Sequence, residues 1–153
     1  MKKTIYEKRK SMEQKSVFWW IIFILLCIWQ LPQALVGLVM WIFLGKKEMV
    51  ADRHFNFCWK ADKMSGGISL GPIAYVSNRS GKETIAHETD GHTVQSKLLG
   101  IFYLPSVGIC SLIHAWLYNP QKSCYYDYWC EKWANNLAGL ETDSKCRLKF
   151  KNS

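Results

Sequence analysis

Residues 84–97 read Thr-Ile-Ala-His-Glu-Thr-Asp-Gly-His-Thr-Val-Gln-Ser-Lys. The titratable side chains of this stretch are the main clue to the fold and to the functional site. It holds two imidazoles, His87 and His92, and between them the carboxylate of Glu88. Imidazole nitrogen and carboxylate oxygen are atoms with which proteins commonly bind zinc. We therefore expect a helix that begins near Thr84 and presents these three side chains as part of a metal site.

The interval between the two histidines is one residue longer than in the His-Glu-x-x-His motif, whose histidines leave a helix on one face. Each residue of a regular helix turns by about 100°, so rings five positions apart would diverge by about 140°. A π-bulge, with its i→i+5 hydrogen bond, would absorb the additional residue and bring His87 and His92 back together. Gly91 would ease that distortion. In the alternative, Glu88 and His92 are the aligned pair, and Glu88 is a ligand rather than a base.

A further ligand is available near the C-terminus. Residues 124–138 have the pattern of an amphipathic helix that ends at Gly139. Glu131 would lie on one face of this helix, and it could complete a set of two histidines and one glutamate for zinc. Asn135 on the same face, or Asp127, could hydrogen-bond a metal-binding imidazole and fix its tautomer.

The N-terminal part of the chain is typical of a membrane anchor. No charge occurs from Val17 to Leu44, a run longer than the roughly 20 residues that cross a bilayer. Pro32 should break the helix there, and Gln30 and Gln33 beside it would be costly against lipid. A single kinked span and a re-entrant pair of half-helices both fit this pattern. The tryptophans that suit anchoring at the membrane interface are Trp19, Trp20, Trp29 and Trp41.

The length of 153 residues predicts one domain. The expected strands and helices together predict an α+β membrane protein. We divide the chain into a basic N-terminal segment 1–16, the anchor 17–44, a metal-site region 45–140 and a basic tail 141–153. Residues 145–153 of this tail should be frayed. In the metal-site region, residues 65–76 predict strand, which leads to a short antiparallel sheet. Residues 98–118 are a second uncharged stretch, either inserted in the membrane or buried as a hairpin.

Charge and cysteine content indicate the compartment and the partners. The net charge is +8, and basic residues flank the anchor on both sides, which favours membrane lipid over nucleic acid as the partner because no nucleic-acid motif occurs. A re-entrant pair would place both basic flanks, and with them the site, in the cytoplasm. The six cysteines show no paired zinc-finger spacing, so we expect reduced thiols. A disulfide between Cys124 and Cys130 is the alternative.

The chain resembles a family of small bacterial membrane proteins, and its ligand set resembles the gluzincin class of zinc metallopeptidases. The likeness covers roughly residues 30–140. The segments that carry it are Leu31-Pro32-Gln33, Ser69-Leu70-Gly71, His87-Glu88, Gly91-His92, Gln95-Ser96, Leu99-Gly100, Tyr103-Leu104 and Trp129-Cys130-Glu131-Lys132-Trp133-Ala134-Asn135. Three features depart from the family pattern: the additional residue before His92, Asn135 in place of an acidic residue, and Cys110 where proline usually precedes serine.

The resemblance implies that His87, His92 and Glu131 bind Zn²⁺ and that Glu88 is the catalytic base. It implies a membrane-associated hydrolase that acts on the peptide bonds of a peptide or protein substrate. An edge strand around Ile73–Val76 would then pair with the extended substrate, although a strand with a purely structural role gives the same pattern. The alternative function is a non-catalytic membrane scaffold or binding protein that keeps a degenerate form of this site.

Overall fold

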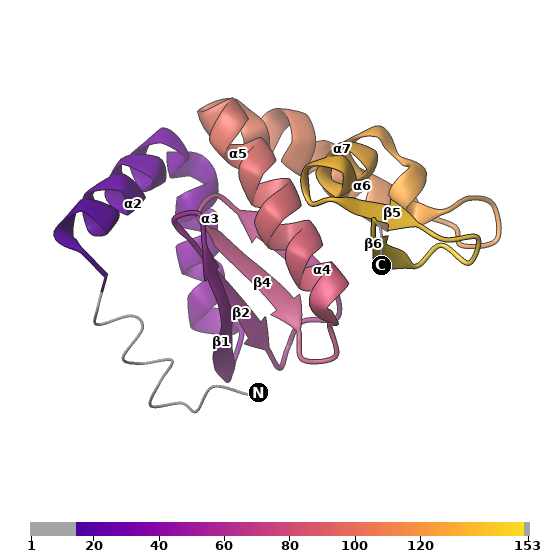
Figure 1. Ribbon diagram of the computed structural model, residues 1–153, viewed down its shortest axis with the longest axis horizontal. Helices are drawn as coiled ribbons and strands as arrows, with labels where there is room; N and C mark the ends of the chain where they lie inside the picture. Colours follow the sequence, from indigo (N-terminus) through magenta and orange to yellow (C-terminus); the bar gives the residue numbers. More distant parts are fainter. Residues whose placement is uncertain (1–14, 152–153) are drawn as a thin grey trace.

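A four-stranded sheet lies between two layers of helices in the computed structural model, which describes residues 15–151 (Figure 1). The strands are β1 (Lys47–Arg53), β2 (Asn56–Ala61), β3 (Gly67–Leu70) and β4 (Ile73–Ser77), in the order β1-β2-β4-β3. The predicted α+β class is confirmed. The predicted purely antiparallel sheet is wrong, because β2 and β4 are parallel while β1–β2 and β3–β4 are antiparallel.

A tight turn joins β3 to β4 and makes these two strands antiparallel. Gly71 and Pro72 alone join the two strands, and Gly71 has φ +67°, which favours glycine. In the sheet, β4 lies beside β2 and β3 lies at the edge. The strand expected at the edge, around Ile73–Val76, is therefore an inner strand, and the edge position belongs to β3.

Alternate side chains of the strands enter two different hydrophobic layers. Tyr75 and Leu70 pack toward the N-terminal helices, and the Tyr75 hydroxyl donates to the Gly37 carbonyl at 2.8 Å. On the opposite face, Ala74 and Val76 pack with Cys58 and with partly buried side chains that include Ile85. The sheet thus holds the N-terminal helices on one side and the helix of the histidines on the other.

The predicted break in the N-terminal apolar run is confirmed. Helices α2 (Val17–Trp29) and α3 (Leu31–Phe43) meet at Gln30 with a bend of 104°, and Pro32 lies in the first turn of α3, where it leaves no helical hydrogen bond unmade. Each helix has 13 residues and is about 20 Å long, which is shorter than the hydrocarbon core of about 30 Å. Over residues 15–151, no single helix is long and apolar enough to cross a membrane.

A second bent pair follows the sheet. Its first arm joins four elements: α4 (Lys82–Ala86), the π-helix η1 (His87–His92), α5 (Thr93–Leu99) and the 3-10 turn η2 (Gly100–Phe102). Its second arm joins the π-helix η3 (Leu104–Gly108) and α6 (Ile109–Leu117). The two arms are bent by 116°. As in the N-terminal pair, the two arms are long and apolar enough for a membrane span only when they are taken together. The apolar stretch predicted at 98–118 is therefore the bend and the second arm of this pair.

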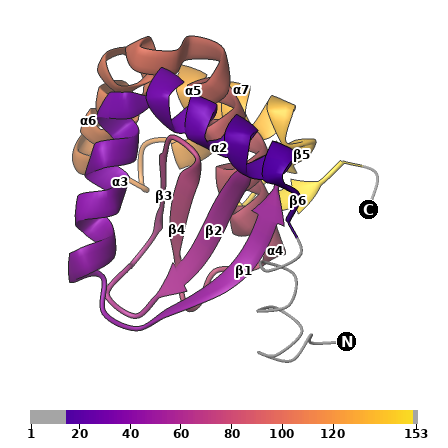
Figure 2. The same cartoon turned by 90° about the vertical axis from the view of Figure 1, so that its left-hand side faces the viewer.

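The two bends pack against each other at one end of the molecule, which is uppermost in Figures 1 and 2. Gln33 donates to the Ser96 hydroxyl at 3.1 Å and to the Gly100 carbonyl at 2.7 Å. The indole of Trp29 donates to the Lys97 carbonyl at 2.9 Å and fills the space that a side chain at position 100 would need. The buried Gln33 thus joins the two bends instead of facing lipid.

Exposed apolar side chains are concentrated on the two bent pairs. Among residues 15–151, all large exposed hydrophobic side chains except Trp129 and Leu137 lie on α2, α3 or residues 98–117. We call the exposed hydrophobic side chains of α2, α3 and residues 98–117 the apolar surface. Large exposed apolar patches are typical of surfaces that contact lipid or another protein.

The C-terminal part is ordered as far as Lys151. Helix α7 (Trp129–Leu137) follows a single 3-10 turn, η4 (Tyr125–Asp127), and is followed by the strands β5 (Leu140–Thr142) and β6 (Leu148–Phe150). The helix predicted from residue 124 therefore begins at Trp129, while its predicted stop at Gly139, with φ +67°, is confirmed. The predicted frayed tail is wrong for residues 145–151. The basic segment predicted at 1–16 lies outside the described residues apart from Lys15 and Ser16.

A disulfide ties this hairpin to the loop before η4. Cys124 bonds to Cys146, while Cys130 is a free, buried thiol. The expectation of reduced thiols is therefore wrong for Cys124 and Cys146, and so is the Cys124–Cys130 alternative. The reason is tertiary: β5 and β6 fold back on the end of α7 and bring Cys146 to Cys124.

Reducing this disulfide should destabilise the protein by about 3 kcal/mol, because the bond closes a loop over a sequence separation of 22. Chemical denaturation of the wild type and of the Cys124→Ser/Cys146→Ser double variant, each with and without reductant, measures the effect. The double variant should be insensitive to reductant. Equal stability of the oxidised wild type and the variant would contradict the prediction.

Candidate metal centre

The two histidines converge because the helix changes pitch between them. Residues His87–His92 form a π-helix, and the amide of Thr93 bonds back to the Glu88 carbonyl, five residues earlier. The ring centroids of His87 and His92 are 4.7 Å apart. The predicted π-bulge is confirmed. The alternative, in which Glu88 is a ligand together with His92, stays open, because the ligand atoms of His87, Glu88 and His92 all lie within 4.8 Å of one another.

A side chain from the sheet stabilises the irregular turn. In a regular helix the Thr89 carbonyl would accept from the amide of Thr93, which here bonds elsewhere. Instead it accepts from the Asn56 amide at 3.0 Å and from the Thr93 hydroxyl. Asn56 is buried at the start of β2 and also donates to the Thr93 hydroxyl at 2.8 Å. Because a buried carbonyl without a partner is costly, Asn56 is part of the reason that the π-turn persists.

Glu131 reaches the histidines from α7. Its Oε2 atom lies 3.0 Å from His87 Nε2 and 3.2 Å from His92 Nε2, and its side chain is 1% exposed. Four ligands in a tetrahedron, with bonds of about 2.0 Å, have neighbouring atoms about 3.3 Å apart. The two distances from the carboxylate oxygen to the imidazole nitrogens are thus close to those expected around one zinc ion.

The outer nitrogen of each imidazole is held by an amide oxygen. His92 Nδ1 lies 2.7 Å from Gln95 Oε1, and the amide nitrogen of Gln95 donates to the Cys130 carbonyl at 2.8 Å, which fixes the orientation of the amide. His87 Nδ1 lies 2.8 Å from Asn135 Oδ1. Each Nδ1 therefore carries a proton and donates it. In the neutral rings, both Nε2 lone pairs then point at the carboxylate of Glu131.

Three acceptor atoms that face one another in a buried place repel unless a cation lies between them. Burial opposes the charged form of His92. The hydrogen bond to Glu131 and the charges of Glu88 and Glu131 outweigh it and raise the pKa of His92 to about 9. Burial also opposes ionisation of Glu131, but the hydrogen bonds from His87 and His92 hold its pKa well below the ordinary value. The donor set fits a metal ion, which would take the place of the proton.

Glu88 lies beside this point and is held by the edge strand. The Ser69 hydroxyl of β3 lies 2.7 Å from Glu88 Oε2 and 3.0 Å from the Glu88 carbonyl, so it can donate to either. Gly67 of the same strand leaves the space that the other carboxylate oxygen occupies. The ligand atoms of His87, Glu88 and His92 lie within 4.8 Å of one another, and this buried group could hold a metal ion.

Hydroxyl groups complete the surroundings of the site. Ser111 of α6 donates to Glu131 Oε1 at 2.5 Å. The ring of Tyr126 lies edge-on to His87, with centroids 5.4 Å apart. Burial first, and then the charges of Glu88 and Glu131, raise the pKa of Tyr126 to about 12, so its hydroxyl remains a donor at neutral pH.

The structure brings together most of the side chains that the sequence nominated. His87, Glu88, His92, Glu131 and Asn135 are all buried in one cluster. Asp127 is not part of it: its side chain is 61% exposed and lies 3.5 Å from Lys132, because the helix that was to carry it begins only after it. Four further polar residues of the site had no role in the sequence-based prediction: Asn56, Ser69, Gln95 and Ser111. Two of them, Ser69 and Gln95, stand in the segments that carry the resemblance to the bacterial family, and that resemblance was the available signal.

No family model, curated protein or solved structure matches this chain. The gluzincin resemblance therefore stays a prediction, and the geometry of the site has to carry the functional argument.

The Gly91→Ala variant should bind metal about 10- to 100-fold more weakly, because the support of a ligand is disturbed. A Cβ atom at position 91 would lie 2.7 Å from the Ala134 carbonyl and would push α7, with Glu131, away from the histidines. Gly66→Ala is the control, since a Cβ atom there has no neighbour within 4 Å. Metal affinity is measured by competition with a chromophoric chelator. Equal affinity of the two variants would contradict the close packing of η1 on α7.

Metal affinity should rise with pH by about tenfold per unit up to the pKa of His92, about 9, since the metal must displace the proton of that ring. The metal-free protein should respond in the opposite direction. The raised pKa of His92 stabilises it fully below pH 6.5, and this contribution is lost as the pH rises through about 9. The lowered pKa of Glu131 stabilises it above pH 4.5 and is lost on acidification.

Thermal unfolding with and without chelator, from pH 4 to pH 9, measures both effects. The metal-free protein should be most stable near pH 4.5 to 6.5. A metal affinity that does not change with pH would show that no proton is displaced from His92.

Proposed function

We propose that this protein is a membrane-associated zinc hydrolase of peptide bonds, in which His87, His92 and Glu131 bind the metal and Glu88 is the general base. One observation carries the proposal. Two Nε2 lone pairs and a carboxylate oxygen, from two different helices, converge on one buried point, with a second carboxylate beside it.

Zinc is the metal that this donor set favours. Two imidazoles and one carboxylate with an open fourth position are typical of catalytic zinc sites, whereas calcium and magnesium prefer oxygen ligands alone. The neutral amide of Asn135 and that of Gln95 orient the rings without adding negative charge. They therefore hold each ring as the neutral tautomer with its proton on Nδ1. A carboxylate in the same place would make the ring more basic.

The chain's own groups suit the hydrolysis of an amide bond. A bound zinc ion would lower the pKa of a water molecule and polarise the substrate carbonyl. Glu88, held by Ser69 at one oxygen, accepts a proton from the attacking water and passes it to the departing amine as the C–N bond breaks. Tyr126 is a donor for the oxyanion that forms on the carbonyl oxygen.

The substrate would lie along β3. The site opens into a pocket of about 790 Å³, lined by β3 on one side and by α6 and η4 on the other. The outer edge of β3 has no neighbouring strand among residues 15–151. Its main chain can therefore hydrogen-bond an extended peptide, as edge strands do in several peptide-binding proteins. The role first expected for Ile73–Val76 passes to Gly67–Leu70.

The apolar surface supports insertion of the two bends into one leaflet of a membrane. Both ends of the N-terminal bent pair carry a lysine over a tryptophan ring: Lys15 is 4.3 Å from Trp19 and Lys47 is 4.5 Å from Trp41. Such pairs suit the headgroup region, where aromatic rings and cations anchor helices. The bends between them would enter the hydrocarbon, and neither pair would cross it.

The side of the membrane is a separate proposal, on which two observations disagree. The basic flanks favour the cytoplasmic side. The Cys124–Cys146 disulfide favours an oxidising compartment, because such bonds are rare in the bacterial cytoplasm. We give the disulfide priority, since charge bias is a tendency of loops next to complete spans. Trapping of free thiols in intact cells tests this: reduced Cys124 and Cys146 would return the site to the cytoplasm.

The Glu131→Ala variant should lose metal, whereas Glu141→Ala, which changes an exposed glutamate on β5, should keep it. Metal analysis of the purified proteins measures this. Glu88→Gln should retain metal and hydrolyse a mixed peptide library about 10²- to 10⁴-fold more slowly, because the base is lost while the ligands remain. Its control is Glu83→Gln, on the same helical arm but outside the pocket.

The non-catalytic scaffold predicts a different result. Under that hypothesis the wild type and Glu88→Gln are equally inactive on every peptide, even when both hold a full complement of zinc. If the wild type contains no metal, the zinc hydrolase hypothesis is wrong, and so is any scaffold role that needs a bound metal.

A further inference from the structure

We propose that the substrate is a polypeptide anchored in the same membrane, and that it is cut within a few residues of the point where it leaves the bilayer. The inference rests on the proposed function and concerns how a peptide would enter the site. It comes from the direction of β3 and from the different chemistry at its two ends.

One end of β3 lies against the inserted bends. Leu70 is followed by Gly71, which packs against Gln30 and Gln33 at the bend between α2 and α3. Figure 2 shows the turn after β3 directly beneath this bend. From Leu70 back to Gly67 the strand runs away from the bends, toward solvent. A peptide paired with β3 would therefore run along the direction from membrane to solvent.

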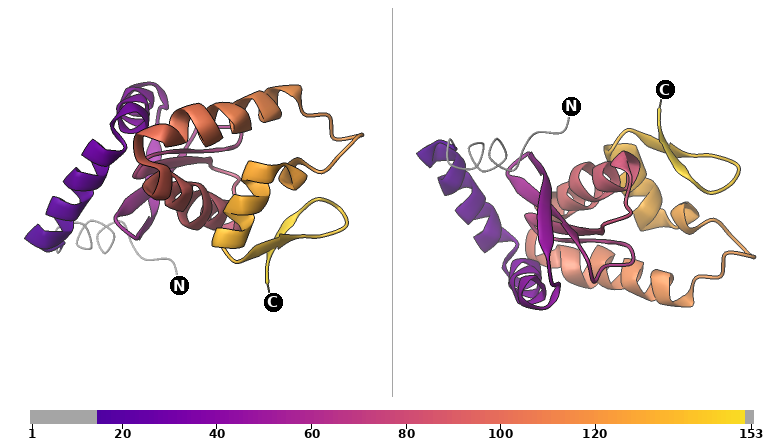
Figure 3. Two further views of the ribbon diagram at one scale, coloured as in Figure 1. Left: turned by 90° about the horizontal axis from the view of Figure 1, so that it is seen from above. Right: turned by 90° about the horizontal axis from the view of Figure 1, so that it is seen from below.

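The mouth of the pocket is continuous with the apolar surface. Val36 of α3 and Ile109 and Leu112 of α6 all line the pocket. They are also 42%, 46% and 65% exposed, and so belong to the apolar surface as well. Seen from above, α6 and α5 diverge from their shared bend, and α7 lies toward their far ends (Figure 3). The opening between α3 and α6 thus faces the region that the lipid would occupy.

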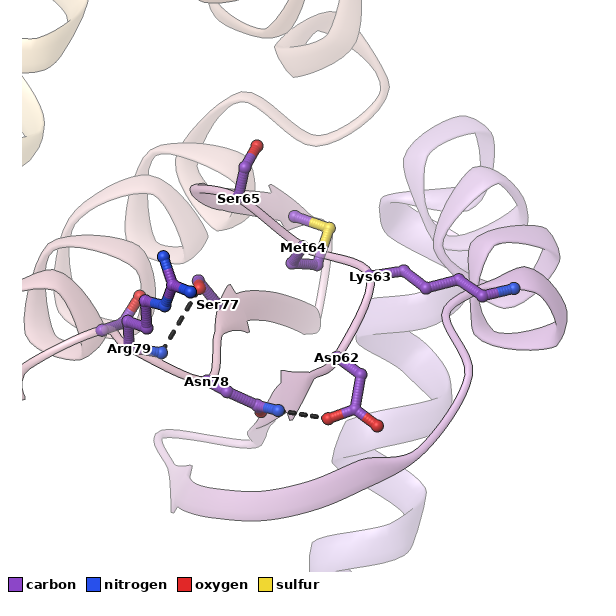
Figure 4. Close-up of a pocket in the computed structure, with 8 residues that line it drawn as sticks. Asp62, Lys63, Met64, Ser65, Ser77, Asn78 and Arg79 are labelled. Carbon is purple, nitrogen blue, oxygen red and sulfur yellow. Dashed lines mark hydrogen bonds between the residues drawn. The ribbon is translucent and has the colours of Figure 1, made fainter.

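The other end of the groove is polar. Ser65 and Ser80 line the site pocket and also a second pocket, of about 650 Å³, formed by the loops at the solvent end of the sheet. Figure 4 shows this second pocket, with Asn78 hydrogen-bonded to Asp62 and with Lys63 and Arg79 pointing in different directions. The chain that leaves the site would here meet hydroxyl, amide and charged groups, which suit a solvated segment.

The length of β3 sets the distance of the cut from the membrane. The strand has four residues and spans about 13 Å at roughly 3.3 Å per residue. Glu88 lies against Gly67 and Ser69, within this length. A segment that leaves the hydrocarbon at the Leu70 end would therefore present a bond to Glu88 after about two to four residues. A free peptide has no such constraint on the position of its cut.

The first test is to map the cuts in a mixed-sequence peptide library, presented either free or with a hexadecyl chain at one terminus, in vesicles of phosphatidylethanolamine and phosphatidylglycerol. The zinc-loaded wild type should cut anchored peptides about a hundredfold faster, since a shared membrane raises their effective concentration. Mass spectrometry should place the cuts within about four residues of the anchored end. Cuts spread evenly along the anchored peptides would overturn the inference and leave the proposed function standing.

The second test does not depend on turnover. The Glu88→Gln variant is incubated with anchored peptides that carry a benzophenone either next to the anchor or at the far end. The first should cross-link to α3 or α6, and the second to residues 77–80. Leu112→Asp should lower the ratio of anchored to free peptide that is cross-linked, whereas Leu137→Asp, an exposed position on α7, should not. The reverse pattern, or equal ratios, would overturn the inference. If the wild type cuts neither form of the library, the proposed function itself fails.

Discussion

Three lone pairs that meet in a buried place, two on imidazole nitrogens and one on a carboxylate oxygen, are the constraint on which the rest of this structure depends. Without a cation the arrangement is repulsive, so the fold has to hold it together. It does so from outside: Gln95 and Asn135 fix the tautomers of the rings, and Ser111 holds the carboxylate. Each support is a neutral group, so the net charges at the centre are those of the carboxylates and of the protonated His92, whose proton a metal ion would replace.

The same constraint explains two irregular features of the backbone. The π-turn exists because histidines five residues apart have to face one carboxylate, and Asn56 provides the hydrogen bonds that the irregular turn lacks. Gly91 is required for a reason different from flexibility: it lets the π-turn approach the main chain of α7 at Ala134. The two helices are then close enough for Glu131 to contact both rings. A regular helix with a larger residue at position 91 would satisfy neither condition.

The candidate base is tied to the sheet more than to its own helix. Ser69 and Gly67 hold the carboxylate of Glu88 against β3. Any shift of that strand would therefore move the base with it. This links the position of the base to the strand that would bind the substrate. The two bends, joined by Gln33, cover the end of the same strand, so the apolar surface and the site share one element of the sheet.

The chain sequence by itself determined the local features, because each depends on near neighbours: the break at Pro32, the stop at Gly139, the apolar runs and the need for a π-bulge between His87 and His92. It also identified Glu131 and Asn135, whose spacing places them on one helical face. Tertiary structure alone decided the rest. The parallel pairing of β2 and β4, the Cys124–Cys146 bond, the exclusion of Asp127 and the roles of Asn56 and Ser69 all join residues far apart in the chain. Such contacts depend on how the helices and strands pack against one another. The sequence of one segment does not specify which distant residue will lie next to it in the folded protein.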